Sequence, residues 1–319
     1  MGLRESLARF GAQAPVPVFP LLGRGSGDAL TTLEADSRLD VVSSPRAANV
    51  LLLVGGLARG LLREGCRVHD QMSHPRTTLW WPRGAETRRL LRRMGSLTIV
   101  ESTSLPVDSV RSVHTELLSR ARASEGHVLP DVDPEPWRGL GPYGQGGKGM
   151  TGGVPYGRPM AGRAPDRDGL ELDQLRVRVG PFFLPFPPGL TLDVDLQGDL
   201  VQNVVVRRGP VPRHVGVGGV FASLASGAVS AVEVRTVELA RARHHLQWLS
   251  HFLRGVGLGA LADRALCLAR EVGPDSIWKV RRLRRTLERP GTLGWSTAHV
   301  APLPRAVAEK LGGPGARAS

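Results

Sequence analysis

Residues 180–206 read G-P-F-F-L-P-F-P-P-G-L-T-L-D-V-D-L-Q-G-D-L-V-Q-N-V-V-V, and this stretch predicts how the rest of the chain is organised. Residues 190–196 alternate apolar and polar side chains with a period of two, as a β-strand with two unlike faces does. Residues 200–206 form a second run rich in β-branched residues, and Gln197-Gly198-Asp199 separates the two runs. The stretch therefore predicts a β-hairpin.

The alternation also predicts which face of the first strand is buried. The apolar residues Leu192, Val194 and Leu196 fall on one side, and Asp193 and Asp195 fall on the other. Burying an unpaired carboxylate costs several kcal/mol, and a one-residue slip would bury both. We therefore expect the apolar side to face the core and the two carboxylates to face water or a partner.

The chain enters this hairpin through an apolar loop that proline makes stiff, because residues 181–188 contain four prolines. The same loop contains Phe183 and Phe186. Aromatic side chains in such a loop are typical of contact surfaces. We expect these two residues to lie at an interface with a partner.

Composition sets outer limits on function. The chain has 319 residues, which favours two domains, and a net charge of +13 that comes mainly from arginine. This charge permits binding to nucleic acid, anionic lipid or acidic proteins, although arginine-rich codon usage explains it equally well. Cys66 and Cys267 stand far apart without Cys or His at ligand spacing, so neither predicts a zinc or iron–sulfur motif. They are expected to be ordinary thiols in a reducing cytoplasm.

Residues 1–122 are predicted to form a small parallel α/β domain. Strand-like runs at 14–22, 49–54, 77–81 and 96–101 alternate with helical patterns at 57–66, 85–94 and 108–122. Such alternation is typical of a parallel sheet. The glycine-rich loop at 23–28 lacks the spacing of a dinucleotide fingerprint and the Lys-Ser/Thr of a P-loop, so phosphate binding there is a minor alternative.

Residues 123–172 are predicted to form a Gly/Pro-rich linker without regular structure. The aromatic residues Trp137, Tyr143 and Tyr156 punctuate it. Such residues anchor segments that become ordered on a partner, so we expect these three at an interface. The alternative is a disordered linker with aromatic residues placed by chance.

Residues 173–319 are predicted to combine the hairpin with a helical domain, so that the whole fold is α/β plus α+β. Helical patterns cover 232–256, 258–272 and 276–289. The first of these carries His244, His245 and His251, but not at the i, i+4 spacing of a zinc helix with a nearby carboxylate. No metal site is expected there, and no segment has the ~20 apolar residues of a membrane span.

The first domain resembles the small, cluster-bearing subunit of respiratory complex I and of membrane-bound [NiFe] hydrogenases. The matching stretches, in order, are 17–30, 44–56 (S-P-R-A-A-N-V-L-L-L-V-G-G), 74–84 (H-P-R-T-T-L-W-W-P-R-G) and 96–107. The last part is similar to the large subunit of the same complexes. Its matching stretches are the hairpin at 179–206, the helix at 238–253 (E-L-A-R-A-R-H-H-L-Q-W-L-S-H-F-L) and G-G-P-G-A-R-A-S at 312–319.

The chain departs from that family where the family holds its cofactors. The resemblance implies cluster cysteines near 23–27, 82–84 and 105–107, but none of these stretches contains cysteine. The hairpin loop lacks the family's quinone-side histidine, and residues 207–230 lack the hydrogenase cysteine pair. We therefore expect no catalytic, cofactor-binding or metal-binding residues, and no cofactor.

Three functions follow as alternatives. The resemblance implies a non-catalytic structural or accessory subunit of a complex-I-like or hydrogenase-like assembly. Its partners would be the other subunits, and it would lie in the cytoplasm, peripheral on the inner face of the membrane. It would have no small-molecule substrate of its own, and nucleic acid is not an expected partner of that subunit. The second is a redox subunit whose cofactor a partner chain completes. The third is a polyanion-binding protein that binds phosphates through the cations Lys279, Arg281, Arg282, Arg284 and Arg285.

Overall fold

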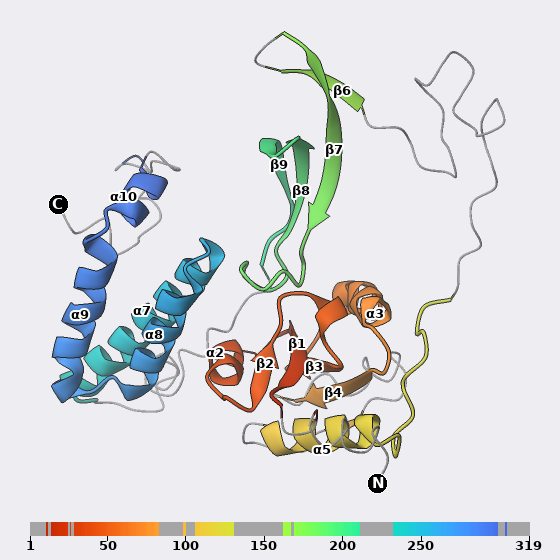
Figure 1. Ribbon diagram of the computed structural model, residues 1–319, viewed down its shortest axis with the longest axis horizontal. Helices are drawn as coiled ribbons and strands as arrows, with labels where there is room; N and C mark the ends of the chain where they lie inside the picture. The colour runs from red at the N-terminus through yellow and green to blue at the C-terminus, as the bar shows by residue number, and fades with distance from the viewer. Residues whose placement is uncertain are drawn as a thin grey trace. The chain divides into compact units, whose positions relative to one another are not determined.

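The structure is a computed structural model that describes residues 11, 14–24, 26, 29–82, 98–99, 106–130, 162–166, 169–210, 232–298 and 304. Contacts divide the chain into two compact units, residues 1–233 and 234–319. A parallel sheet, an antiparallel sheet and helices are all present (Figure 1), which confirms the mixed α/β class. The predicted domain boundaries at 122 and 172 stay predictions.

The first unit contains a five-stranded parallel sheet with the order β2-β1-β3-β4-β5. Its strands are β1 (Val16–Leu22), β2 (Leu39–Val41), β3 (Val50–Val54), β4 (Thr77–Trp81) and β5 (Thr98–Ile99). Strand β2 lies on one side of β1, and the chain then crosses over β1 to place β3 on its other side. This order makes the gap between β1 and β3 the switch point at which doubly wound sheets bind ligands.

Helices cover both faces of this sheet. They are α2 (Ala29–Glu34), α3 (Leu62–Gln71) and α5 (Val107–Leu118), with short 3-10 turns η1 (Pro45–Ala47) and η2 (Arg59–Leu61). One core lies against α2 and α5 and the other against η2 and α3, so all five residues of β3 are buried. Burial on both faces explains why β3 is a continuous apolar run.

The predicted helix at 57–66 is displaced in the structure. Residues 59–61 form the turn η2, and α3 continues to Gln71. The helix extends because His69, beyond the predicted end, is also buried on its inner side. The error arose because a polar residue on an inner face does not contribute to a hydrophobic pattern.

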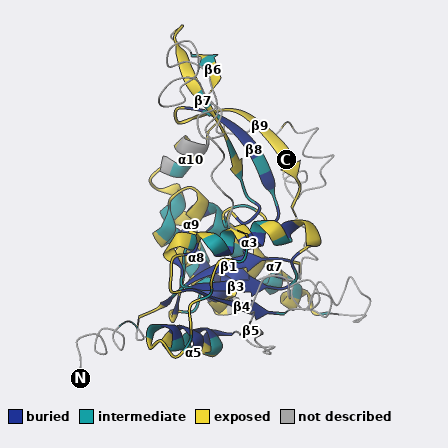
Figure 2. Ribbon diagram, turned by 90° about the vertical axis from the view of Figure 1, so that its right-hand side faces the viewer, coloured by how far each residue is buried: buried dark blue, intermediate teal, exposed yellow. Residues whose placement is uncertain are grey.

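The antiparallel sheet has the order β6-β7-β8-β9. Its strands are β6 (Gly162–Pro165), β7 (Glu171–Val179), β8 (Thr191–Gln197) and β9 (Leu200–Arg208). The predicted hairpin is the pair β8–β9, which turns at Gly198 with a φ of 59°. Figure 2 shows the contrast between the buried strands of the parallel sheet and the exposed β9.

The expectation that residues 123–172 lack regular structure is wrong at the end of that stretch. Strand β6 and the first residues of β7 lie inside it. From Leu175 to Val179, β7 alternates apolar residues with arginine, and this period of two outweighs the glycine and proline before the strand. Residues 131–161 lie outside the described part of the chain.

The second unit consists of helices α7 (Val234–Gly255), α8 (Gly259–Glu271), α9 (Ile277–Glu288) and α10 (Thr292–Thr297), with a 3-10 turn η6 (Pro274–Ser276). The first three agree with the predicted helical ranges to within two residues. They enclose a small core of leucine, alanine and valine. Among the described residues, no helix has the length and apolar content needed to cross a bilayer.

Candidate functional site

Over three successive rows, one face of strands β7, β8 and β9 carries only aliphatic side chains. Residues that pair across an antiparallel sheet lie on the same face, so the register assigns them directly. Three rows result, each with one residue from β7, β8 and β9: Leu175–Leu196–Val201, Val177–Val194–Val204 and Val179–Leu192–Val206. We call these nine residues the aliphatic face.

Much of the aliphatic face is open in the part of the chain that the structure describes. The exposed fractions of Leu175, Val201, Val204 and Val206 lie between 48% and 62%. Of the nine residues, only Val194 is buried. Contiguous exposed aliphatic side chains are typical of surfaces that another molecule covers.

The opposite face of the same strands carries a ladder of ion pairs. Asp193 accepts hydrogen bonds from Nε of Arg178 at 2.8 Å and from Nε of Arg207 at 2.5 Å. Asp195 accepts from Nε of Arg176 at 2.6 Å and from Nδ2 of Asn203 at 3.1 Å. Hydrogen bonds from Arg178 and Arg207 lower the pKa of Asp193 to about 2, and the pKa of Asp195 is lowered mainly by Arg176.

The ladder corrects the predicted burial of β8. Asp193 and Asp195 do lie on the face opposite the apolar residues, but each is only 7% exposed, whereas Leu192 and Leu196 are half-buried. The guanidinium groups that cover the carboxylates are themselves 57–70% exposed. The carboxylates are therefore shielded by hydrated cations from the two neighbouring strands and not by an apolar interior.

The loop between β7 and β8 has an inner and an outer side. Phe182 is buried in the core beneath α3, and Leu184 packs against both cores of the parallel sheet. Phe183 is exposed, and its ring meets that of Phe186 edge to face, with centroids 5.0 Å apart. The structure thus brings Phe183 and Phe186 together, while Trp137, Tyr143 and Tyr156 lie outside the described residues. An interface role for all five stays a prediction.

The switch point of the parallel sheet is closed by backbone contacts. The N–H of Arg24 donates to the carbonyl of Gly56 at 2.7 Å, and the N–H of Gly56 donates back to Arg24 at 2.9 Å. Gly55 has a φ of 72°, and a Cβ there would lie 2.1 Å from the Arg24 carbonyl oxygen. The loops after β1 and β3 therefore meet where similar sheets hold ligands. The described residues contain no group of three or more side chains able to hold a metal ion.

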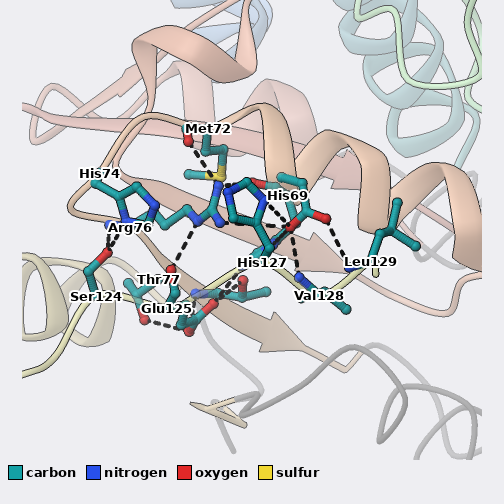
Figure 3. A network of polar contacts seen from close by, with 12 residues as sticks. His69, Met72, His74, Arg76, Thr77, Ser124, Glu125, His127, Val128 and Leu129 are labelled. Carbon is teal, nitrogen blue, oxygen red and sulfur yellow. Dashed lines mark hydrogen bonds and ion pairs between the residues drawn. The ribbon is translucent and has the colours of Figure 1, made fainter. Parts of the chain in front are cut away.

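A network of polar side chains lies at the other end of the sheet, at the start of β4 (Figure 3). His69 is almost fully buried, with Nδ1 2.8 Å from Asp70 and Nε2 3.1 Å from Glu125. Arg76 is equally buried and donates to the backbone carbonyls of His69, Met72 and Glu125. A cation at the last carbonyls of α3 complements the negative end of that helix.

Both carboxylates in this network accept several hydrogen bonds. Glu125 accepts from the hydroxyl groups of Thr77 and Thr78 and from the Thr78 N–H. Asp70 accepts from the N–H groups of Val128 and Leu129 at 2.9 Å each. Burial by itself would raise the pKa of each carboxyl, but these hydrogen bonds and those of His69 outweigh burial and lower both pKa values.

The network fastens residues 124–129 to α3 and β4, and its chemistry fits a structural clamp. Its one pairing of a nucleophile with a base is Ser124 with His74, whose Oγ and Nδ1 lie 2.6 Å apart. A catalytic pair of this kind has a third group that orients the base. Among the described residues, the other ring nitrogen of His74 has no such partner. We assign the clamp a structural role.

The clamp is not among the features predicted from the sequence. The features of the sequence that could have indicated the clamp were polar residues in apolar surroundings. Thr77 and Thr78 begin a strand that is buried along its length, and His69 lies on the inner side of α3. Each has a structural explanation only when Glu125, some fifty residues away, is placed beside them. The sequence does not show that pairing.

The helical unit brings together some of the residues noted in the sequence. The rings of His244 and His245 are 6.3 Å apart, and among the described residues they belong to no metal-binding group. Of the five cations considered for polyanion binding, Lys279 pairs with Glu271 at 2.7 Å and Arg284 pairs with Glu288 at 2.7 Å.

No protein-family model matches this chain, and no curated protein is significantly similar to it.

Proposed function

We propose that this chain is a non-catalytic structural subunit of a membrane-associated oxidoreductase assembly of the complex I or [NiFe]-hydrogenase type. It would be peripheral at the inner face of the cytoplasmic membrane and held there by its partner subunits. The observation that carries the proposal is the aliphatic face, which presents an apolar sheet surface that a neighbouring subunit would cover. The backbone contacts between Arg24 and Gly56 support the non-catalytic part, since they join the two loops between which doubly wound sheets bind ligands.

Covering the aliphatic face would contribute a favourable free energy to docking. Burying a valine or leucine side chain that was exposed contributes about 1.5–3 kcal/mol. Four such side chains are open among the nine. The ion-pair ladder behind them holds the three strands in register, so the surface is already ordered before a partner arrives.

The experiment compares two substitutions in β9 on opposite faces of the sheet. Val206 belongs to the aliphatic face, and its neighbour Val205 points to the ladder face, where it pairs with Asp193. Both are exposed, so neither Val206→Lys nor Val205→Lys should unfold the chain. Each variant would be purified in the native complex from membranes, and its partners identified by mass spectrometry.

We expect Val206→Lys to lose the partner subunits and Val205→Lys to keep them, with equal thermal unfolding of the isolated chains. Partners that carry iron–sulfur or quinone-binding sequences would support the assembly type. Intact assembly of Val206→Lys would show that the aliphatic face is not the interface. Partners unrelated to electron transfer would overturn the assembly type, and stoichiometric iron in the isolated chain would favour the redox alternative.

A further inference from the structure

Helices α8 and α9 present two matching stripes of side chains to one another. The stripe on α8 consists of Asp263, Arg264, Cys267, Leu268 and Glu271. The stripe on α9 consists of Trp278, Lys279, Arg282, Leu283 and Thr286, with the same spacing along the helix. Each stripe spans nine residues, so its first and last residues are about 12 Å apart along the helix. Together they line a groove with a volume of about 520 Å³.

The floor of this groove is apolar, and its wall carries a solvent-exposed aromatic ring. Leu268 and Leu283 are buried at the base and belong to the core of the helical unit. Trp278 lines the groove and is 58% exposed, and Ile277 beside it is exposed to the same extent. Tryptophan next to a desolvated pocket is typical of the residues that dominate binding energy at interfaces.

The charges around the groove are unbalanced. Asp263 pairs with Arg254 at 2.9 Å, and Glu271 pairs with Lys279 at 2.7 Å, so both acidic residues are neutralised. Arg264 and Arg282 have no ion-pair partner among the described residues. The groove therefore offers an apolar floor between two uncompensated cations, one on each helix.

We propose that this groove is a docking site for an amphipathic helix of a partner protein that carries acidic residues beside its apolar face. A helix in a groove is a common mode of peptide recognition, and its apolar residues recur at the spacing of the two stripes. Acidic side chains on its flanks would meet Arg264 and Arg282, which would fix its orientation. A second copy of this chain is disfavoured, because α9 carries Lys279, Arg281, Arg282, Arg284 and Arg285 and would repel itself.

Cys267 provides a probe inside the groove. Its thiol is exposed, whereas Cys66, the other cysteine, is buried and burial raises the pKa of that thiol. A thiol reagent should therefore label Cys267 first, and loss of the signal in Cys267→Ser would confirm the assignment. The probes are two synthetic helical peptides with leucine on one face, flanked by glutamate in the first and by lysine in the second.

We expect the glutamate peptide at saturation to slow labelling of Cys267 in the full chain by about tenfold, because a covered thiol reacts only when the complex opens. The lysine peptide should have no effect. Arg282→Glu should abolish protection by the glutamate peptide and create protection by the lysine peptide. Arg281→Glu is the matched control, because it makes the same charge change one position away, outside the groove, and should retain the original response.

Equal protection by both peptides, no protection by either, or equal effects of the two arginine variants would overturn the proposal. Protection by heparin or DNA without protection by the glutamate peptide would also overturn it and would favour polyanion binding. The groove lies in the helical unit and does not depend on the aliphatic face. Labelling of Val206→Lys should match the parent chain, so the two proposals can fail separately.

Discussion

Strands β3 and β9 each contain a run of aliphatic residues, but the two strands have opposite environments. Strand β3 reads V-L-L-L-V, and every residue in it is buried. Strand β9 reads L-V-Q-N-V-V-V-R-R, and every residue in it is exposed. The first is flanked by β1 and β4 and covered on both faces, whereas the second ends its sheet. The comparison shows that an apolar run predicts a strand but does not predict what covers it.

An exposed apolar edge favours unwanted pairing with other chains, and β9 limits this at its end. Arg207 and Arg208 close the strand with two positive charges, which is one of the ways in which natural edge strands avoid aggregation. Arg207 also belongs to the ladder through Asp193. The edge is therefore protected at one end, while the aliphatic face remains available.

The largest expected difference between the two strands comes from truncating one side chain in each. Leu52→Ala should lower the free energy of unfolding by about 2–5 kcal/mol, because it leaves a cavity in a closed core. Val206→Ala should change it by about 0.5 kcal/mol or less, because its side chain is exposed. Urea denaturation of both variants measures the difference. Equal losses would mean that β9 is covered in the isolated chain.

The next largest effect should come from the clamp at the start of β4. Glu125 accepts from four donors, and Glu125→Gln replaces one of its two acceptor oxygens by an NH2 group, which cannot accept. We therefore expect the free energy of unfolding to fall by about 1–3 kcal/mol. Ser73→Ala is an exposed control nearby that removes only a hydrogen bond to the Arg46 carbonyl, and it should cost about 1 kcal/mol or less. Urea denaturation and limited proteolysis of residues 123–130 check this. A stability equal to the parent would show that the clamp is not formed.

The same clamp predicts how stability depends on pH. The pKa values of Asp70 and Glu125 are lowered in the folded chain, so the unfolded chain binds protons first as the pH falls. Their stabilisation is complete above the ordinary carboxyl pKa and is lost as the pH falls through the folded values. Glu125→Gln should therefore flatten the acid limb of a stability–pH curve. A limb of unchanged slope would contradict the lowered pKa of Glu125.

In the exposed sheet, Asp193 should titrate by NMR near pH 2, below its ordinary value of 3.8. Arg178→Gln should raise that pKa, because Arg178 contributes the largest share of the shift. Arg163→Gln on β6 is a control whose cation pairs with Asp173 and not with the ladder. An Asp193 that titrates at its ordinary pKa would show that the ladder does not persist in solution.

A small effect on the isolated chain is also expected from Phe183→Ser. Its ring is exposed and contacts Phe186, and such aromatic pairs contribute about 0.5–1.5 kcal/mol. We expect an unfolding change at the low end of that range together with weaker assembly. The control, Phe182→Ser in the core, should unfold the chain much more readily. Full assembly by Phe183→Ser would remove this residue from the predicted interface.

The parts of this fold that the sequence predicts are those set by neighbours along the chain. The run at β3, the turn at Gly198 and the helical spacing of α7, α8 and α9 were all identified correctly. The burial of Asp193 was not, because it depends on Arg178 and Arg207, which lie 15 and 14 residues away on other strands. The clamp was missed for the same reason, and the groove between α8 and α9 required both helices to be placed.

The contact between the loops after β1 and β3 restricts how this chain can change. A Cβ at Gly55 would lie 2.1 Å from the Arg24 carbonyl, and one at Gly23 would lie 2.4 Å from the Gly56 carbonyl. Cysteine at either position would separate the loops before it supplied a ligand, and at Gly55 it would also require a left-handed backbone. Replacement of larger residues by glycine meets no such obstacle. Single substitutions can therefore produce the contact between these loops more readily than they can remove it. A metal-binding site at this edge of the sheet would require several substitutions at once.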